Sequence, residues 1–230
     1  MDNNRGTGKL RRLNEYFQVA FRFYNLKQEY LTPVLFVILL AIIFLPNLIQ
    51  EINFTFFAAY IASRIVFYVV STIYLLACIK EFKNEKYTVK TLLKEVMLKI
   101  HKVIATWAIY DILTSAGMFL LIAPGIYFYL SYIFNICYLM DKNESIFGTF
   151  KASGKITSGI KLQILYAISF LVLLRLFPFI AYDPAKKFLI FLFVLSFLAS
   201  VTHLIQQRMV ALMYMDLEYG KKLDEGQEWE

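Results

Sequence analysis

The residues from which most catalytic and metal sites are built are scarce in this chain. Its 230 residues include two cysteines, Cys78 and Cys137, and two histidines, His101 and His203. Each cysteine lies in an apolar run with no second cysteine or histidine nearby, which argues against zinc and redox motifs. No nucleophile elbow, phosphate-binding loop, H-E-x-x-H motif or dinucleotide fingerprint occurs. The sequence therefore predicts no enzyme, no cofactor and no metal site; an intramembrane reaction at Asp111 is the remaining enzymatic alternative.

Charged residues are also few. They make up 18% of the chain against 59% hydrophobic residues, and the mean hydropathy is +0.57. A soluble globular chain is nearer half apolar and a quarter charged, so part of this apolar surface is expected to face lipid. The net charge of +7 comes from residues that flank apolar runs, and no separate hydrophilic region could carry a nucleic-acid groove. We expect no nucleic-acid partner.

Long apolar runs are the main feature of the sequence. A helix needs about 20 mostly apolar residues to cross the hydrocarbon core of a bilayer. Six runs meet or approach this length: 31–49, 55–79, 103–123, 126–140, 162–181 and 188–214. The sequence thus predicts an all-α fold, a polytopic membrane bundle of about six transmembrane helices. It would form one domain, residues 1–215, followed by an acidic cytoplasmic tail, residues 216–230.

The basic residues orient these spans. Lys and Arg number 6, 7, 4 and 3 in residues 1–30, 80–102, 141–161 and 208–230, which together hold 20 of the 24 in the chain. The connections on the opposite side hold only Lys186 and Lys187. Short cytoplasmic loops of membrane proteins are enriched in Lys and Arg, so we expect a multi-pass protein of the cell membrane with both termini in the cytoplasm. Short outer connections, including a turn at Pro124–Gly125, would make each pair of spans a hairpin.

An amphipathic stretch precedes each hairpin. The apolar sides follow helical spacing: Leu13, Tyr16, Phe17, Ala20, Phe21 and Tyr24; then Val89, Leu92, Leu93, Val96, Met97 and Ile100; then Ile146, Phe147 and Phe150. Lys86, Lys90 and Lys94 form a basic stripe beside the second face, and Asn143 is expected to cap the third helix. Such helices suit the headgroup layer, where anionic lipids attract lysine. The alternative is that they are ordinary helical connectors.

The segment around residues 119–160 resembles a known family. Ala123-Pro124-Gly125-Ile126, an aromatic-rich span, Met140-Asp141 and the run Phe150 to Gly159 are similar to a bacterial family of six-helix membrane proteins. That family is related to the membrane domain of glycerophosphoryl diester phosphodiesterases. The resemblance implies a six-helix fold and does not imply the phosphodiesterase activity, which in fused relatives belongs to a separate soluble barrel.

Polar residues inside the spans are the candidate binding residues, because ionisable groups in a bilayer are costly and usually face a partner or a wet cavity. Arg64 and Asp111 should both lie near mid-membrane on adjacent helices and could form an ion pair. Ser115 shares a helical face with Asp111. A second polar face on the last span consists of Ser196, Ser200, His203 and Gln207. These residues could hold the helices together, line a ligand groove or relay ions.

Two functions from different classes follow. The first is a non-enzymatic scaffold or accessory factor that acts through membrane lipids, a membrane-protein partner or its own oligomer, and it is favoured by the short loops and the missing catalytic motifs. The second is the membrane component of a transport or export system, and it depends on the polar groove around Arg64 and Asp111.

Overall fold

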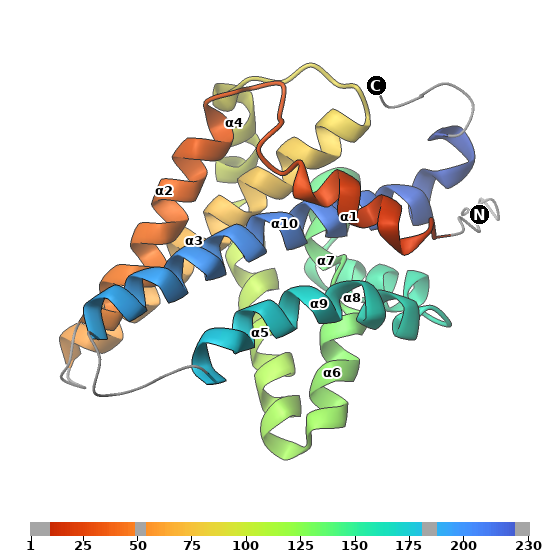
Figure 1. Ribbon diagram of the computed structural model, residues 1–230. Coiled ribbons are helices and arrows are strands. Elements are labelled where there is room, and N and C mark those ends of the chain that lie inside the picture. Colours follow the sequence, from red (N-terminus) through yellow and green to blue (C-terminus); the bar gives the residue numbers. More distant parts are fainter. Residues whose placement is uncertain (1–9, 49–53, 181–187, 224–230) are drawn as a thin grey trace.

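Helices form every regular element of the computed structural model, which describes residues 10–48, 54–180 and 188–223 (Figure 1). No strand occurs within these ranges, so the all-α prediction is confirmed for them. In chain order the elements are α1 (Leu13–Phe21), α2 (Leu31–Phe44), the 3-10 helix η1 (Leu45–Leu48), α3 (Phe54–Phe82), α4 (Val89–Leu98), α5 (Ile100–Leu120), α6 (Ile122–Ser131), α7 (Asn135–Lys142), α8 (Ile146–Ile156), α9 (Lys161–Ile180) and α10 (Phe188–Leu223).

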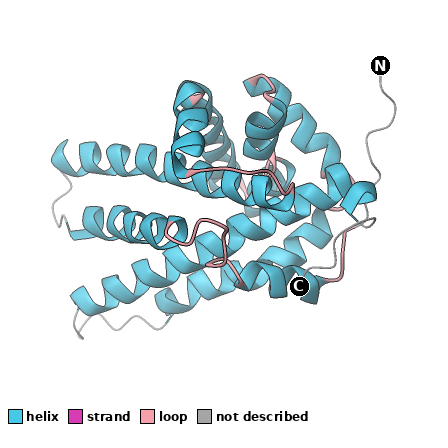
Figure 2. Ribbon diagram, turned by 90° about the horizontal axis from the view of Figure 1, so that it is seen from above, coloured by secondary structure: helices cyan, strands magenta, loops and turns pink. Residues whose placement is uncertain are grey.

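Two long helices, α3 and α10, form the centre of the bundle. Helix α10 packs against α1, α2, α3 and α9, and α3 also contacts α4, α5 and α7. Seen from above, several long helices run alongside one another (Figure 2). Every residue from 70 to 79 and from 202 to 217 is buried. Burial on all sides of a helix marks a core element, so these halves of α3 and α10 are enclosed by protein.

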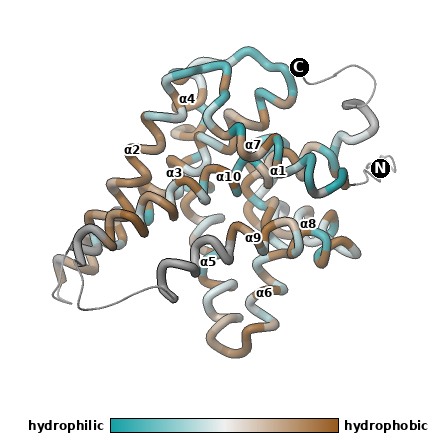
Figure 3. The backbone as a smooth tube through the Cα atoms, viewed as in Figure 1, coloured by the Kyte–Doolittle hydropathy of each residue, from teal (hydrophilic) through white to brown (hydrophobic). Residues whose placement is uncertain are grey.

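The opposite ends of the helices are apolar and exposed. Phe54 at the start of α3 is 87% exposed, and Phe119 at the end of α5 is 91% exposed. Hydropathy follows the same division, with hydrophilic residues gathered near α1 and the connections beside α4 (Figure 3). Large exposed apolar surfaces are rare on soluble proteins and mark contact with lipid or a partner. This apolar end of the bundle is therefore expected to contact lipid or a partner.

Three stretches are long and apolar enough to cross a membrane: Phe56–Phe82, Ile100–Leu120 and Ile122–Asp141. Leu31–Phe44 is an apolar helix of less than spanning length, and α9, Lys161–Ile180, is apolar over Lys161–Leu171. The coarse prediction of apolar helices of membrane-crossing length is confirmed for the three. The count of six spans stays a prediction, and the outer connections around residues 49–53 and 181–187 lie outside the described residues.

The predicted fourth span, 126–140, is not one continuous helix. It consists of the end of α6 and most of α7, separated by a turn at Tyr132–Phe134. Side chains of α8 satisfy the backbone groups that the turn releases: the Ser153 hydroxyl accepts from the Phe134 N–H at 3.2 Å and donates to the Ser131 carbonyl at 2.8 Å. Irregular backbone inside a membrane needs such partners. The sequence of residues 126–140 alone could not predict them, because they lie on α8.

The turn between α5 and α6 lies earlier than predicted. Helix α5 ends at Leu120, Leu121 is extended, and α6 begins at Ile122, so Pro124 and Gly125 belong to the first helical turn of α6. Proline is tolerated there because the first N–H groups of a helix have no intrahelical partner. Glycines allow α5 and α6 to pack closely, because a Cβ on Gly117 of α5 would lie 2.8 Å from the Gly125 Cα of α6.

Gly117→Ala is expected to lower the free energy of unfolding by about 1–3 kcal/mol, because the added methyl meets backbone that cannot move aside. Gly154→Ala is the matched control, since a Cβ there meets only the Tyr132 ring at 3.7 Å. Alanine is the better helix former, so the control should gain up to about 1 kcal/mol. SDS titration in mixed micelles measures both. Equal effects of the two changes would show that α5 and α6 are not held this closely.

Two predictions at helix ends are wrong in position. Asn143 does not cap α8; it ends α7 in the left-handed conformation (φ 53°), which asparagine tolerates better than most residues. The α8 cap is Ser145, whose hydroxyl accepts from the Gly148 N–H at 3.1 Å. The predicted tail also begins later than residue 216, because α10 continues through Leu223 and Asp216 is buried. Residues 224–230 lie outside the described residues.

Candidate functional site

An ion pair joins α3 to α5 in the middle of the bundle. The Arg64 guanidinium donates to the Asp111 carboxylate, and the Tyr68 hydroxyl donates to the same carboxylate at 2.6 Å. The guanidinium also lies over the Phe67 and Tyr68 rings, 5.3 Å from each centroid. The two side chains are 36% and 29% exposed. The pair predicted from the sequence therefore forms, and its two charges cancel.

A cavity of about 190 Å³ lies behind this pair, between α3, α5, the α6–α7 segment and α10. Its walls combine aromatic rings with polar groups; the lining residues used below are Arg64, Asp111, Asn135, His203, Gln206 and Gln207. The Ser71 hydroxyl hydrogen-bonds to His203 Nε2 at 2.7 Å, and the Gln206 amide donates to the Tyr129 hydroxyl. The Trp107 indole donates to Thr72 at 3.0 Å. Helices that are distant in sequence thus meet at a shared polar surface.

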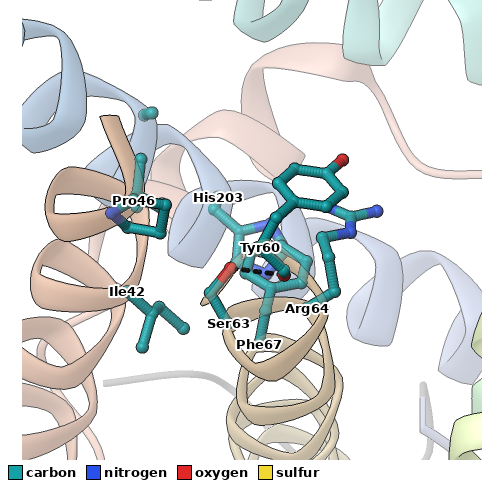
Figure 4. Close-up of a pocket in the computed structure, with 9 residues that line it drawn as sticks. Ile42, Pro46, Tyr60, Ser63, Arg64, Phe67 and His203 are labelled. Atoms are coloured by element: carbon teal, nitrogen blue, oxygen red, sulfur yellow. Dashed lines mark hydrogen bonds between the residues drawn. The ribbon is translucent and has the colours of Figure 1, made fainter. Parts of the chain in front are cut away.

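Arg64 lies where three cavities meet. One, of about 260 Å³, opens between α2, α3 and α10 and is lined by Ile42, Pro46, Tyr60, Phe67 and His203 among others (Figure 4). Another, of about 460 Å³, follows the exposed side of α3 and α5. Arg64 and Asp111 line both that groove and the inner cavity. The ion pair is therefore the wall between the inner cavity and the outer face of the bundle.

The structure brings together some of the predicted binding residues and separates others. Arg64, Asp111, His203 and Gln207 all line the inner cavity. Ser115 lies on the exposed side of α5, in the α3–α5 groove. Ser200 is buried, and its hydroxyl donates at 2.7 Å to a carbonyl of its own helix, that of Ser196. In the part of the polar face formed by Ser196 and Ser200, the hydrogen bond of the Ser200 hydroxyl is therefore made within α10.

Several residues in or beside the cavity were not predicted. Ser71 and Thr72 stand out as a polar pair inside an apolar run, and they bond to His203 and Trp107 of the cavity wall. Asn135 interrupts an aromatic-rich run and lines the cavity itself. Gln206 immediately precedes Gln207 of the predicted face, and a helix turns it by about 100° from that residue. The sequence signal was an uncharged polar residue inside a span, which is common between packed helices and does not by itself indicate which helices meet.

A second polar cluster lies at the basic end of the bundle, around two carboxylates. Asp141 accepts from Tyr214 at 2.7 Å, from Tyr219 at 2.6 Å and from Lys83. Burial, with the hydrogen bond to Asp141, raises the pKa of the Tyr219 hydroxyl, which therefore stays a donor at neutral pH.

The other carboxylate, Asp216, ties the N-terminal segment to α10. It accepts from Arg11 Nε at 3.0 Å and from the Tyr16 hydroxyl at 2.8 Å. Burial raises the pKa of Tyr16, and the nearby Asp216 carboxylate adds to the shift. Within the described residues, no group of three or more His, Cys, Asp or Glu side chains is placed to hold a metal ion. The hydrogen bonds and ion pairs of this cluster connect α1, α3, α7 and α10.

No protein-family model, curated protein or solved structure matches the chain. None of these comparisons links it to the family related to the phosphodiesterase membrane domain, and that resemblance stays a prediction made from residues 119–160.

Proposed function

We propose that this chain is a multi-pass protein of the cell membrane, with both termini in the cytoplasm, that catalyses no reaction. It acts as a scaffold or accessory factor through anionic lipids of the cytoplasmic leaflet and through membrane-protein partners. The support comes from the three apolar helices of spanning length, the concentration of Lys and Arg at one end of the bundle, and the surface of α4.

The surface of α4 is the single observation that carries this proposal. Three neighbouring strips run along the helix. Leu92 and Val96 are fully buried against the bundle, whereas Val89, Leu93 and Met97 are 39%, 42% and 54% exposed. Beyond them lies the third strip, in which Lys90 and Lys94 are exposed. A helix at the bilayer surface needs this order of protein, acyl chain and headgroup contacts.

A helix cap and an ion pair fix the position of α4. Thr88 caps its first turn, where the hydroxyl accepts from the Thr91 N–H at 3.2 Å. Glu95 pairs with Lys80 of α3 at 3.0 Å. Because α4 follows the end of α3 and precedes α5, it lies at the ends of two spans rather than along them. The exposed strip is held where a cytoplasmic headgroup layer would lie.

The other two amphipathic helices divide their apolar sides in the same way. On α8, Phe150 is buried and Phe147 is 80% exposed. On α1, Tyr16 is 2% exposed and Phe21 is 45% exposed. Each helix therefore has one apolar edge against the bundle and one turned outward, which favours contact with lipid over the role of a solvated connector.

Removing the lysine stripe is expected to lower selectivity for anionic lipid. Each lysine near an anionic surface contributes about 1 kcal/mol, so Lys86→Gln, Lys90→Gln and Lys94→Gln combined should clearly lower the ratio of phosphatidylglycerol to phosphatidylcholine around the protein. Lipids retained by the purified full chain after reconstitution in an equal mixture measure this ratio. The matched control replaces the same lysines by arginine, keeps the charge and should keep the enrichment. Equal lipid ratios in the wild type and the glutamine variant would refute lipid binding by α4.

A second candidate function is supported by the polar cavity. A membrane component of a transport or export system needs polar groups that converge inside the bundle, and Arg64, Asp111, His203 and Gln207 converge there. This chain shows no nucleotide-binding motif, so active transport would depend on an ion gradient or on a separate ATPase. A stoichiometric ATPase or transporter subunit that copurifies with the chain would favour this function over the first.

A further inference from the structure

The inner cavity contains polar groups without partners. Among the residues that the structure describes, Asn135 Nδ2 and Gln206 Oε1 are buried atoms with no hydrogen bond. Their side chains belong to residues only 2% and 7% exposed, and both line the cavity. A buried polar atom left unpaired costs about 1–3 kcal/mol, so such atoms are normally paired with ordered water or a ligand.

The amide orientations do not change this result. Asn135 Oδ1 accepts from the Ile136 N–H at 2.6 Å, which leaves the amide nitrogen without a partner. Gln206 uses one amide atom on Tyr129, and its other atom is unpaired whichever way the amide is turned, because each end of a primary amide forms hydrogen bonds. Two residues of the cavity wall, Asn135 and Gln206, therefore each carry one unpaired amide atom.

The size and charge of the cavity limit what can occupy it. Its volume is about 190 Å³, and one water takes about 30 Å³ of the liquid, so several waters or one small organic molecule fit. The charges in the wall belong to Arg64 and Asp111, and they neutralise each other. An ion would find no net countercharge and would lose its hydration at a high cost. An uncharged molecule that both donates and accepts hydrogen bonds meets no such cost.

We infer that the cavity between α3, α5, α7 and α10 is a hydrated binding site for a small uncharged molecule that carries hydroxyl or amide groups, held by Asn135, Gln206 and Gln207. The aromatic walls, including Trp107 and Tyr110, contact its carbon atoms. This site goes beyond the proposed lipid-dependent function and does not depend on α4. If the transport alternative holds, the cavity is the place where an uncharged cargo would bind.

Thiol labelling in lipid nanodiscs tests this inference, because both faces of the protein are then accessible. In the full chain with Cys78→Ala and Cys137→Ala, Gln207→Cys places one thiol in the cavity wall. Met209→Cys is the matched control on the same helix, since Met209 is fully buried and does not line the cavity. The probes are three methanethiosulfonates that carry a hydroxyethyl, a sulfonatoethyl or a trimethylammonioethyl group. Each labelling rate is divided by the rate for the same variant unfolded in SDS.

The uncharged hydroxyethyl reagent should modify Gln207→Cys at least about tenfold faster than Met209→Cys, and at least about tenfold faster than either charged reagent does, since charge is excluded from a neutral buried site. Asn135→Cys should behave alike and keeps the test decisive if Gln207→Cys does not fold. Labelling as slow as at Met209→Cys would overturn the inference, because the cavity would then be closed to water. Equal rates for all three reagents would also overturn it, because the space would then be an open aqueous path without selectivity for uncharged molecules. Neither result would bear on lipid binding by α4.

Discussion

Asp141→Ala is expected to lower the free energy of unfolding by about 3–5 kcal/mol, the range for breaking a buried ion pair by removing one partner. The Asp141 side chain is 4% exposed and accepts from Lys83, Tyr214 and Tyr219. Its loss leaves the Lys83 ammonium and two tyrosine hydroxyls without their acceptor.

SDS titration of the purified chain in mixed micelles, followed by circular dichroism, measures this loss. Glu144→Ala is the matched control: it removes a carboxylate three residues away that makes none of these bonds, and it should change the stability by less than about 0.5 kcal/mol. Tyr214→Phe and Tyr219→Phe each remove one hydrogen bond and should cost about 1 kcal/mol. Unfolding of Asp141→Ala at the wild-type SDS concentration would mean that this carboxylate does not hold α3, α7 and α10 together.

The Arg64–Asp111 pair should respond asymmetrically to substitution. Asp111→Ala is expected to cost about 2–3 kcal/mol, because the arginine stays charged at any physiological pH and is left without its partner. Arg64→Ala should cost less, about 1–2 kcal/mol, because a carboxylate can take up a proton and Asp111 keeps the Tyr68 hydroxyl at 2.6 Å. The double variant Arg64→Ala with Asp111→Ala should recover most of the loss and come within about 1 kcal/mol of the wild type.

The same SDS titration measures this cycle, and Ser115→Ala is the control because Ser115 lines the same groove on an exposed face. Additive costs for the two single changes would contradict a coupled pair. The cycle also bears on function. If the double variant is stable and the cavity thiol of Gln207→Cys still prefers the uncharged reagent in that background, the pair is structural. The transport alternative then loses the ion pair as its support and keeps only the cavity.

The helical elements could be predicted from the sequence because their causes are local. Apolar runs and the i, i+3, i+4 spacing over residues 13–24 and 89–100 depend only on neighbouring residues, and α1 and α4 begin where these patterns do. The Arg64–Asp111 pair was also predictable, since two opposite charges on adjacent spans have few other partners at that depth. The six spans were inferred from length alone. In the described chain, Phe56–Phe82 and Ile100–Leu120 reach spanning length within one helix, and Ile122–Asp141 reaches it as two helices joined by a turn.

Features that depend on contacts between distant segments could not be predicted from the sequence. The turn at Tyr132–Phe134 exists because Ser153 of α8 satisfies its backbone, and no pattern within residues 126–140 contains that information. The partners of Asp141 are Lys83, just after α3, and Tyr214 of α10, both far from it in the sequence. The cavity likewise needs Asn135 and Gln206, which only packing brings together. Periodicity in the sequence determines which face of each helix is polar. Side-chain packing determines which polar faces come into contact, and a binding site depends on those contacts between helices.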